Sequence, residues 1–130
     1  MKRSPIKKKS AKSSAKLRLE CDVMWAKIVK HRAKGKCEQC GIEGRDAHHM
    51  VHRRRSAYLR HDLRNGVLLC VGCHSRFHNW ESISLWKWME ETRPEDFEAI
   101  REAMNQVHKV DLKDVHFRLK SQLEVYNEDI

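Results

Sequence analysis

The sequence predicts a mostly helical α+β protein whose small central hairpin is held by a metal site. Apolar residues recur at helical spacing on both sides of the middle of the chain, and the middle itself carries two short extended runs. Two Cys-x-x-Cys pairs bracket those runs. At 130 residues the chain has room for one domain. We expect a single domain over residues 17–130, with a core at 37–79 and a helical part at 82–126.

The N-terminal region predicts a tail followed by a helix. Residues 1–16 are rich in Lys and Ser and nearly lack apolar side chains, so they cannot bury enough surface to offset their ordering entropy. We expect a disordered basic tail there. A helix is predicted from Leu17 to Arg32 because apolar residues recur on one face, and Gly35 closes it. Cys21 lies on this apolar face and is interpreted as a core residue.

The middle of the chain predicts two short strands and a short helix. Residues 46–51 and 67–70 can pair as an antiparallel hairpin. Between them, residues 52–65 are interpreted as a long polar loop, which carries five arginines and a single acidic residue. A short helix is expected after Cys73 and through about Asn79.

The C-terminal third predicts three helices from apolar residues at helical spacing. The first runs from Ser82 or Ser84 to Glu91. The second starts at Thr92-Arg-Pro-Glu95, a capping box with proline in the first turn. The third begins near Asp111. Their core-facing residues are expected to be Ile83, Trp86 and Met89 in the first, Phe97, Ile100, Ala103, Met104 and Val107 in the second, and Leu112, Val115, Leu119, Leu123 and Tyr126 in the third.

The formal net charge of +9 is unevenly distributed. Residues 1–19 carry eight basic residues and no acid, and residues 20–89 carry thirteen basic residues against seven acids. Residues 90–130 are acidic, with eleven acids against six basic residues. A basic arm and a basic face suit a polyanion, because neutralised phosphates release counterions. Charge alone does not separate nucleic acid from an anionic membrane surface, and a solubilising tail is the simpler alternative.

Nothing in the sequence predicts a membrane span or a secretory signal. No stretch of 18 apolar residues occurs, and no apolar region follows the basic N-terminus. We therefore expect a cytoplasmic protein in a reducing compartment. There, paired cysteines at Cys-x-x-Cys spacing indicate metal ligands rather than disulfides.

The two cysteine pairs predict a structural zinc site. Cys37-x-x-Cys40 and Cys70-x-x-Cys73 place four thiolates within reach of one tetrahedral ion. The 29 residues between the pairs exceed the usual zinc-ribbon gap of about 15–20. An insert therefore separates the two pairs, and it contains histidines.

A second set of potential ligands lies in and after this insert. It consists of His48, His49, Asn65, His74 and His78. His74 and His78 are four residues apart, so a helix puts both on one face. In a strand, His48 and His49 point to opposite sides, so one can bind a metal while its neighbour faces something else.

These residues form a pattern that resembles a known family. In order along the chain, the pattern consists of Cys-x-x-Cys-Gly, Asp46-Ala-His-His49, Asn65-Gly-Val-Leu-Leu-Cys-Val-Gly-Cys73-His74 and then His78. It resembles that of the HNH (His-Me finger) endonucleases. Within that family it is most similar to the phage NinG (Rap) recombination endonucleases. The likeness to HNH proteins covers about residues 37–79, and the likeness to the phage group extends more weakly to the end of the chain.

The resemblance implies a ββα-metal fold and a role for each matched residue. His49 falls at the position of the general base that activates water, and Asn65 at that of the asparagine that braces the loop. His48 and His74 fall at metal-ligand positions, and His78 at a position that binds metal or phosphate. A catalytic divalent ion is implied, most simply Mg²⁺ or Mn²⁺, with Zn²⁺ or Ni²⁺ as alternatives. A histidine that is neutral near pH 7 suits phosphodiester hydrolysis.

The arginines of the insert predict contacts with DNA. Arg53, Arg54, Arg55, Arg60 and Arg64 lie between the expected base and the bracing asparagine, where they can contact phosphates without reading bases. The partner expected is DNA, in a bacterial or phage-infected cell, and a homodimer remains open.

Three functions compete at this stage. The first is a DNA endonuclease, with branched or recombination intermediates among its candidate substrates. The second is a non-catalytic zinc module that binds nucleic acid, and the third is a protein-interaction adaptor that uses the acidic C-terminal helices. The complete His-Asn-His set favours the endonuclease, because a binding module needs no base beside a metal site.

Overall fold

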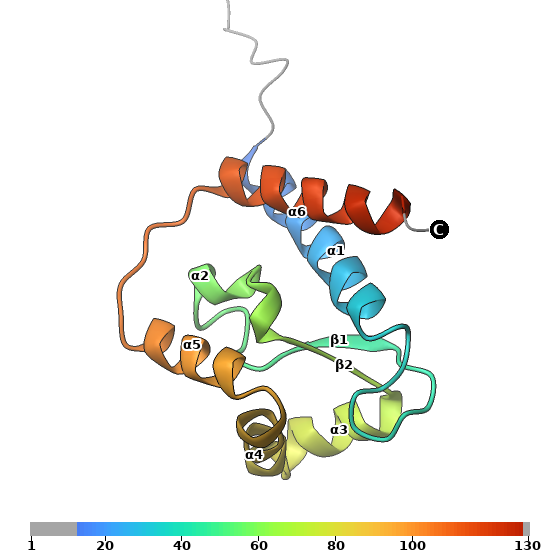
Figure 1. The fold of residues 1–130 in the computed structure, drawn as a ribbon. Helices are drawn as coiled ribbons and strands as arrows, with labels where there is room; N and C mark the ends of the chain where they lie inside the picture. The colour runs from blue at the N-terminus through green and yellow to red at the C-terminus, as the bar shows by residue number, and fades with distance from the viewer. Residues whose placement is uncertain (1–12, 129–130) are drawn as a thin grey trace, which may run out of the picture.

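The computed structural model describes residues 13–128 and confirms the predicted class: a mostly helical protein around a two-stranded antiparallel sheet (Figure 1). Within residues 13–128, no helix combines the length and apolar character needed to cross a membrane. The elements are α1 (Ser14–Arg32), β1 (Asp46–His49), α2 (Ala57–Arg60), the 3₁₀ turn η1 (Leu63–Asn65), β2 (Gly66–Leu69), α3 (Val71–Asn79), α4 (Ser82–Thr92), α5 (Pro94–Met104) and α6 (Leu112–Glu128).

Helix α1 begins earlier than predicted. Ser14 to Lys16 form its first turn, so the predicted boundary of the tail at residue 16 is wrong. The physical reason is a cap: the Ser13 hydroxyl accepts a hydrogen bond from the Lys16 N–H at 3.1 Å. The rest of the predicted tail, residues 1–12, lies outside the described residues.

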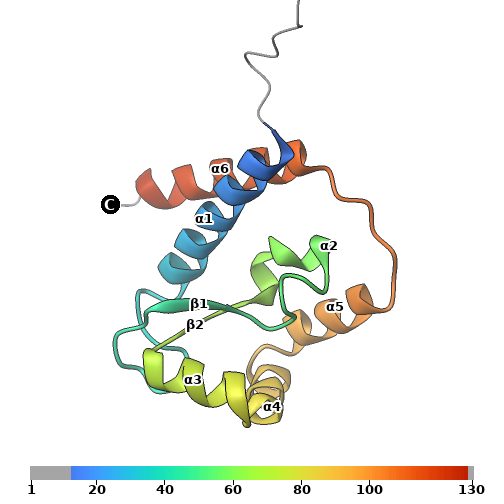
Figure 2. The same ribbon diagram turned by 180° about the vertical axis from the view of Figure 1, so that it is seen from behind.

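The hairpin separates two buried clusters. Its register pairs Asp46 with Leu69 and His49 with Gly66. Alternation along β2 sends Leu69 into the cluster formed with α3, α4 and α5, and Leu68 into the cluster formed with α1 and α6. Both views show α1 and α6 lying together on one side of the hairpin and α3 and α4 on the other (Figures 1 and 2).

Gly66 sets how closely the hairpin approaches α1. A Cβ atom at this position would lie 2.5 Å from Val29 Cγ2 and 2.8 Å from Trp25 Cζ2. Only a residue without a side chain therefore fits between β2 and these two core residues of α1.

The region predicted as one long polar loop contains two short helical segments. Ser56 caps α2 by accepting a hydrogen bond from the Leu59 N–H at 3.1 Å, and Asp62 caps η1 in the same way through the Arg64 N–H. Leu59 anchors the segment because its side chain is fully buried. The loop prediction was therefore wrong for this part, where each segment has a side-chain cap and an apolar residue, Leu59 or Leu63, that packs against a buried cluster.

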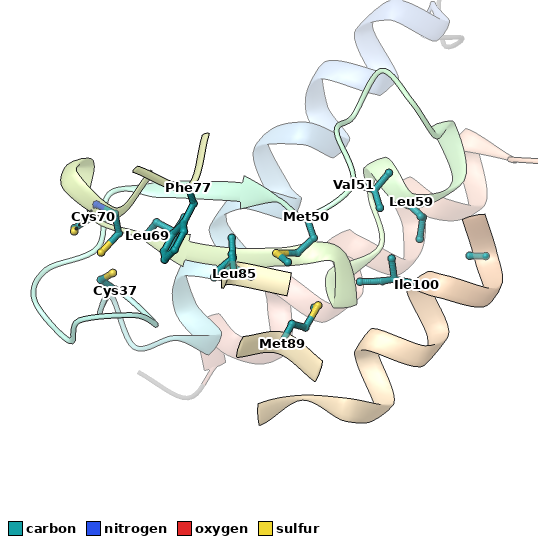
Figure 3. Packing of buried hydrophobic residues seen from close by; sticks show 13 residues of the cluster. Cys37, Met50, Val51, Leu59, Leu69, Cys70, Phe77, Leu85, Met89 and Ile100 are labelled. Atoms are coloured by element: carbon teal, nitrogen blue, oxygen red, sulfur yellow. Dashed lines mark hydrogen bonds between the residues drawn. The ribbon is translucent and has the colours of Figure 1, made fainter. Parts of the chain in front are cut away.

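Helix α4 buries Met89 as predicted but differs from the prediction at one core-facing residue. Ile83 is 74% exposed, whereas Leu85 is 2% exposed and packs beside Met89 (Figure 3). Trp86 is half-buried against the same cluster. The inward prediction was thus wrong for Ile83, and Leu85 takes its place.

The start of α5 also differs from the prediction. Thr92 is the last residue of α4 and does not cap α5, whose N-cap residue, Arg93, makes no side-chain cap. The Arg93 guanidinium instead donates to the carbonyls of Gly66 and Arg64, at 2.9 Å each. The capping-box prediction fails because the turn between the two helices is too short to release Thr92.

The end of α5 is more exposed than predicted. Met104 is 41% exposed, and Val107 is fully exposed because it lies beyond the end of the helix, where helical spacing no longer applies. In α6 the predicted stripe does face α1: Leu119 is buried, and Val115, Leu123 and Tyr126 pack against the same cluster.

We predict that truncating Leu85 to alanine lowers the free energy of unfolding by about 2–5 kcal/mol, because a buried leucine leaves a cavity. The same truncation at Ile83 should change it by less than about 0.5 kcal/mol, since that side chain is exposed. Urea denaturation of the two variants measures both values. A larger loss for Ile83→Ala would mean that α4 packs in the orientation that the sequence predicted.

Candidate active site and metal centre

The four predicted cysteine ligands lie together at one end of the hairpin. The Sγ atoms of Cys37, Cys40, Cys70 and Cys73 all lie within 4.8 Å of one another, and those of Cys40 and Cys70 are 3.6 Å apart. A zinc ion bound by four thiolates holds its sulfur atoms about 3.8 Å apart. The donor set therefore fits a structural metal such as zinc.

Each cysteine pair is shaped by its local backbone. In the first pair, Gly41 adopts a positive φ of 82°, which lets the chain reverse directly after Cys40. In the second, Cys70 is the N-cap of α3, and its sulfur accepts a hydrogen bond from the Cys73 N–H at 3.4 Å. Burial raises the pKa of the Cys37 thiol, but backbone hydrogen bonds outweigh burial and lower that pKa to about 6. Thiolate is the form that binds zinc.

A group of histidines gathers on the side of β1 that faces α3. The ring centroids of His48 and His74 are 5.2 Å apart, and those of His74 and His78 are 5.8 Å apart. His74 Nδ1 also lies 3.1 Å from a carboxylate oxygen of Asp46, which leaves its Nε2 for another partner. Burial and the nearby His74 lower the pKa of His48 to about 4, so its imidazole is neutral at pH 7.

The donor atoms of these histidines are more widely spaced than those of the cysteine cluster. Over residues 13–128, the four cysteines form the one set of three or more potential ligands whose donor atoms all lie within 4.8 Å of each other. The His74 ring lies near both the His48 ring and the His78 ring, and we call these three residues the histidine row. The imidazole nitrogens and the carboxylate of Asp46 are suitable donors for a divalent ion.

His49 points to the other side of β1, toward α1. Its ring stacks on Trp25 with centroids 3.9 Å apart and an angle of 9° between the planes. Its Nε2 lies 2.9 Å from the carbonyl oxygen of Arg60. Because a carbonyl only accepts, Nε2 carries the hydrogen and Nδ1 is the basic nitrogen. Burial lowers the pKa of His49 to about 4, which keeps the ring neutral at pH 7.

Helix α1 supports this arrangement through two residues that the sequence analysis missed. Asp22 binds the Arg60 guanidinium through two hydrogen bonds of 2.9 and 2.7 Å, and its carboxylate lies 2.7 Å from His61 Nε2. Trp25 Nε1 donates to the Asp62 carbonyl at 2.9 Å. Burial raises the pKa of the Asp22 carboxyl group, but its hydrogen bonds with Arg60 and His61 outweigh burial and lower that pKa. Asp22 and Trp25 lie three residues apart, on one face of α1.

Asn65 is fully buried and ties together the two ends of the segment that follows β1. Its Oδ1 accepts a hydrogen bond from the Val51 N–H at 2.8 Å. Its Nδ2 donates to the carbonyls of Val51 and Leu59 at 3.0 and 3.1 Å. This amide therefore fixes the loop geometry, as a bracing asparagine must.

The five arginines of the insert divide into two groups. Arg53, Arg54 and Arg55 are exposed, and none of them forms an ion pair within residues 13–128. Arg60 is occupied by Asp22, and Arg64 binds Asp62 through hydrogen bonds of 3.0 and 2.8 Å. The first group is thus available to a phosphate, whereas the second is held by carboxylates.

Comparison with known proteins agrees with this geometry in one respect. Residues 37–79 match the family model of the HNH endonucleases, over about a third of the chain. The matched segment contains both cysteine pairs, both strands and α3. HNH proteins are generally nucleases, so the match indicates an activity on nucleic acid. No curated protein and no solved structure matches the chain, and the likeness to the phage recombination group remains a prediction.

We predict that Cys40→Ser releases the structural metal and unfolds the hairpin region, since metal binding supplies on the order of 10 kcal/mol in small zinc domains. The zinc content per chain and the melting temperature should both fall. Cys21→Ala provides the matched control, because Cys21 is buried in α1 outside the cluster and its variant should keep its zinc. Unchanged zinc content and melting in Cys40→Ser would contradict a four-cysteine site.

We also predict that Asp22→Asn lowers the free energy of unfolding by about 1–3 kcal/mol, because it leaves a partly buried guanidinium poorly paired. Asp114→Asn is the control, since Asp114 pairs with Arg118 on an exposed helix face and its loss should cost less than about 0.5 kcal/mol. Chemical denaturation distinguishes the two. Equal small effects would show that the contact between Asp22 and Arg60 does not hold α1 to the loop.

Proposed function

We propose, from the HNH match, that this protein is a metal-dependent DNA endonuclease that hydrolyses phosphodiester bonds, with branched or recombination intermediates as its substrates. The observation that carries the proposal is the neutral, fixed ring of His49, which directly follows His48 of the histidine row along β1. A module that only binds nucleic acid has no use for a base held in this way.

In this proposal His49 is the general base. Its Nδ1 accepts a proton from the water that attacks phosphorus, while the bond from Nε2 to the Arg60 carbonyl and the stack on Trp25 fix the plane of the ring. The neutral state supports this role, because a base must be unprotonated before it accepts a proton. Asn65 acts at a distance by holding α2, the short helix that carries Arg60.

The residues that would hold the catalytic ion are His48, His74 and His78, with Asp46 orienting His74 through Nδ1. Mg²⁺ or Mn²⁺ is the ion we expect, and when bound it would stabilise negative charge on the phosphate and on the departing oxygen. Imidazole ligands would add no negative charge of their own to the site.

We assign the DNA contact first to the exposed run Arg53–Arg55. These side chains lie on the segment that starts four residues after His49 and have no carboxylate partner within residues 13–128. Arginine forms paired hydrogen bonds with phosphate oxygens, which positions a duplex without selecting a base sequence. A phosphate contact by Arg60 or Arg64 would require each to leave its carboxylate.

The test is a cleavage assay with supercoiled, linear and four-way-junction DNA, in Mg²⁺, in Mn²⁺ and without an added divalent ion. We expect cleavage that depends on the ion, and a loss of about 10²–10⁴-fold in His49→Ala, the range for a general base. His31→Ala, on an exposed position of α1, should cleave at the normal rate. Binding without cleavage under every metal would contradict the proposal and support a non-catalytic module.

A further inference from the structure

An open pocket lies between the segment that follows β1 and the helices α4 and α5. Its volume is about 470 Å³, within the range of pockets that bind small organic groups. It is not part of the histidine row, the cysteine cluster or the contacts of His49. Its lining consists of Met50, Val51, His52, Arg55, Trp86, Phe97, Ile100, Arg101 and Met104.

The lining is apolar and aromatic inside, with cations at its edge. Trp86 and Phe97 are both half-buried and meet edge to face, with ring centroids 6.2 Å apart and planes at 72°. Arg55 and Arg101 supply positive charge, and among residues 13–128 no acidic residue lines the pocket. Outside the pocket, Arg101 lies 3.7 Å from Glu98 on the exposed surface of α5. A flat aromatic group attached to an anion complements such a lining.

The pocket lies close to the proposed site along the chain. Met50 directly follows His49 and is two residues from His48, a spacing of about 7 Å in an extended chain. The Met50 N–H donates to the Asn65 carbonyl at 2.9 Å, and the Asn65 side chain binds Val51. The same asparagine therefore braces both the proposed active site and one wall of the pocket.

The run Arg53–Arg55 lies between the proposed active site and the pocket along the chain. Arg55 lines the pocket, and Arg53 and Arg54 precede it on the exposed loop. A nucleic acid strand whose phosphates contact this loop can therefore present a base to the pocket. A base within a duplex is stacked and paired, whereas an unpaired base needs the least energy to leave the stack.

We propose that this pocket receives an unpaired nucleobase, so that the protein prefers DNA that contains one. The inference rests on the proposed function, because it takes the bound polymer to be DNA. Trp86 and Phe97 contact the base, and Arg55 and Arg101 lie near its flanking phosphates. The residues concerned are specificity determinants and take no part in the hydrolysis.

The test measures binding by the full chain without an added divalent ion, so that no cleavage occurs. Three duplexes of one sequence are compared: fully paired, with one extra unpaired base, and with an abasic residue in place of that base. We expect about tenfold tighter binding of the duplex with the unpaired base, since stacking one base on an aromatic residue has roughly that effect. The abasic duplex should lose this advantage, although its backbone is just as flexible.

Two matched variants locate the effect. Met104→Glu places an acid at the partly exposed edge of the pocket, and Val107→Glu makes the same change in charge at a fully exposed apolar residue outside it. The preference should disappear in Met104→Glu and persist in Val107→Glu, with unchanged melting temperatures showing that both fold. A variant that replaces Arg101 by glutamine should weaken the preference without abolishing it.

Each outcome has a distinct meaning. Equal affinity for the three duplexes, or a preference that survives Met104→Glu, overturns the pocket assignment and leaves the proposed endonuclease untouched. An abasic duplex that binds as tightly as the unpaired base shows recognition of flexible DNA, which also overturns the assignment. Failure to bind any DNA contradicts the proposed function itself.

Discussion

The alternation of side chains along two four-residue strands is the constraint on which the rest of the structure depends. Because neighbouring residues of β1 point to opposite faces, His48 meets α3 while His49 meets α1. The same alternation along β2 sends Leu68 and Leu69 into different buried clusters. A shift of β1 by one residue would exchange the sides of His48 and His49, and a shift of β2 by one residue would bring Leu68 to the wrong cluster.

So short a hairpin is marginal by itself and needs support at both ends. At one end the four cysteines can be joined by a metal ion, and the first sulfur of the second pair also caps α3. At the other end the Asn65 amide makes three buried hydrogen bonds to the backbone. The metal centre and the bracing asparagine therefore share one mechanical task, that of holding β1 and β2 in register while the loop between them presents its arginines.

The sequence predicted those parts of the fold and site that depend on local spacing. The cysteine pairs, the two strands and the histidines on α3 follow from distances of two to four residues along the chain. The buried face of α4 could not be predicted from spacing, because apolar residues at positions 83, 85, 86, 88 and 89 fit two different faces. Only packing against the rest of the protein selects Leu85 over Ile83. The roles of Asp22 and Trp25 could not be predicted from local spacing, because their partners Arg60 and Asp62 lie 38 and 37 residues away along the chain.

The placement of α1 affects how this nuclease-like core could be transplanted. Residues 37–79 carry the family pattern, but the aromatic surface under His49 and the carboxylate that holds its backbone partner come from α1. Helix α1 is itself packed against α6, where His31 stacks on Tyr126 and His116 pairs with Glu20. Residues 37–79 therefore do not contain everything that positions His49. A chimaera built with this segment would also need α1 and α6, or a host scaffold with an equivalent aromatic ring and carboxylate.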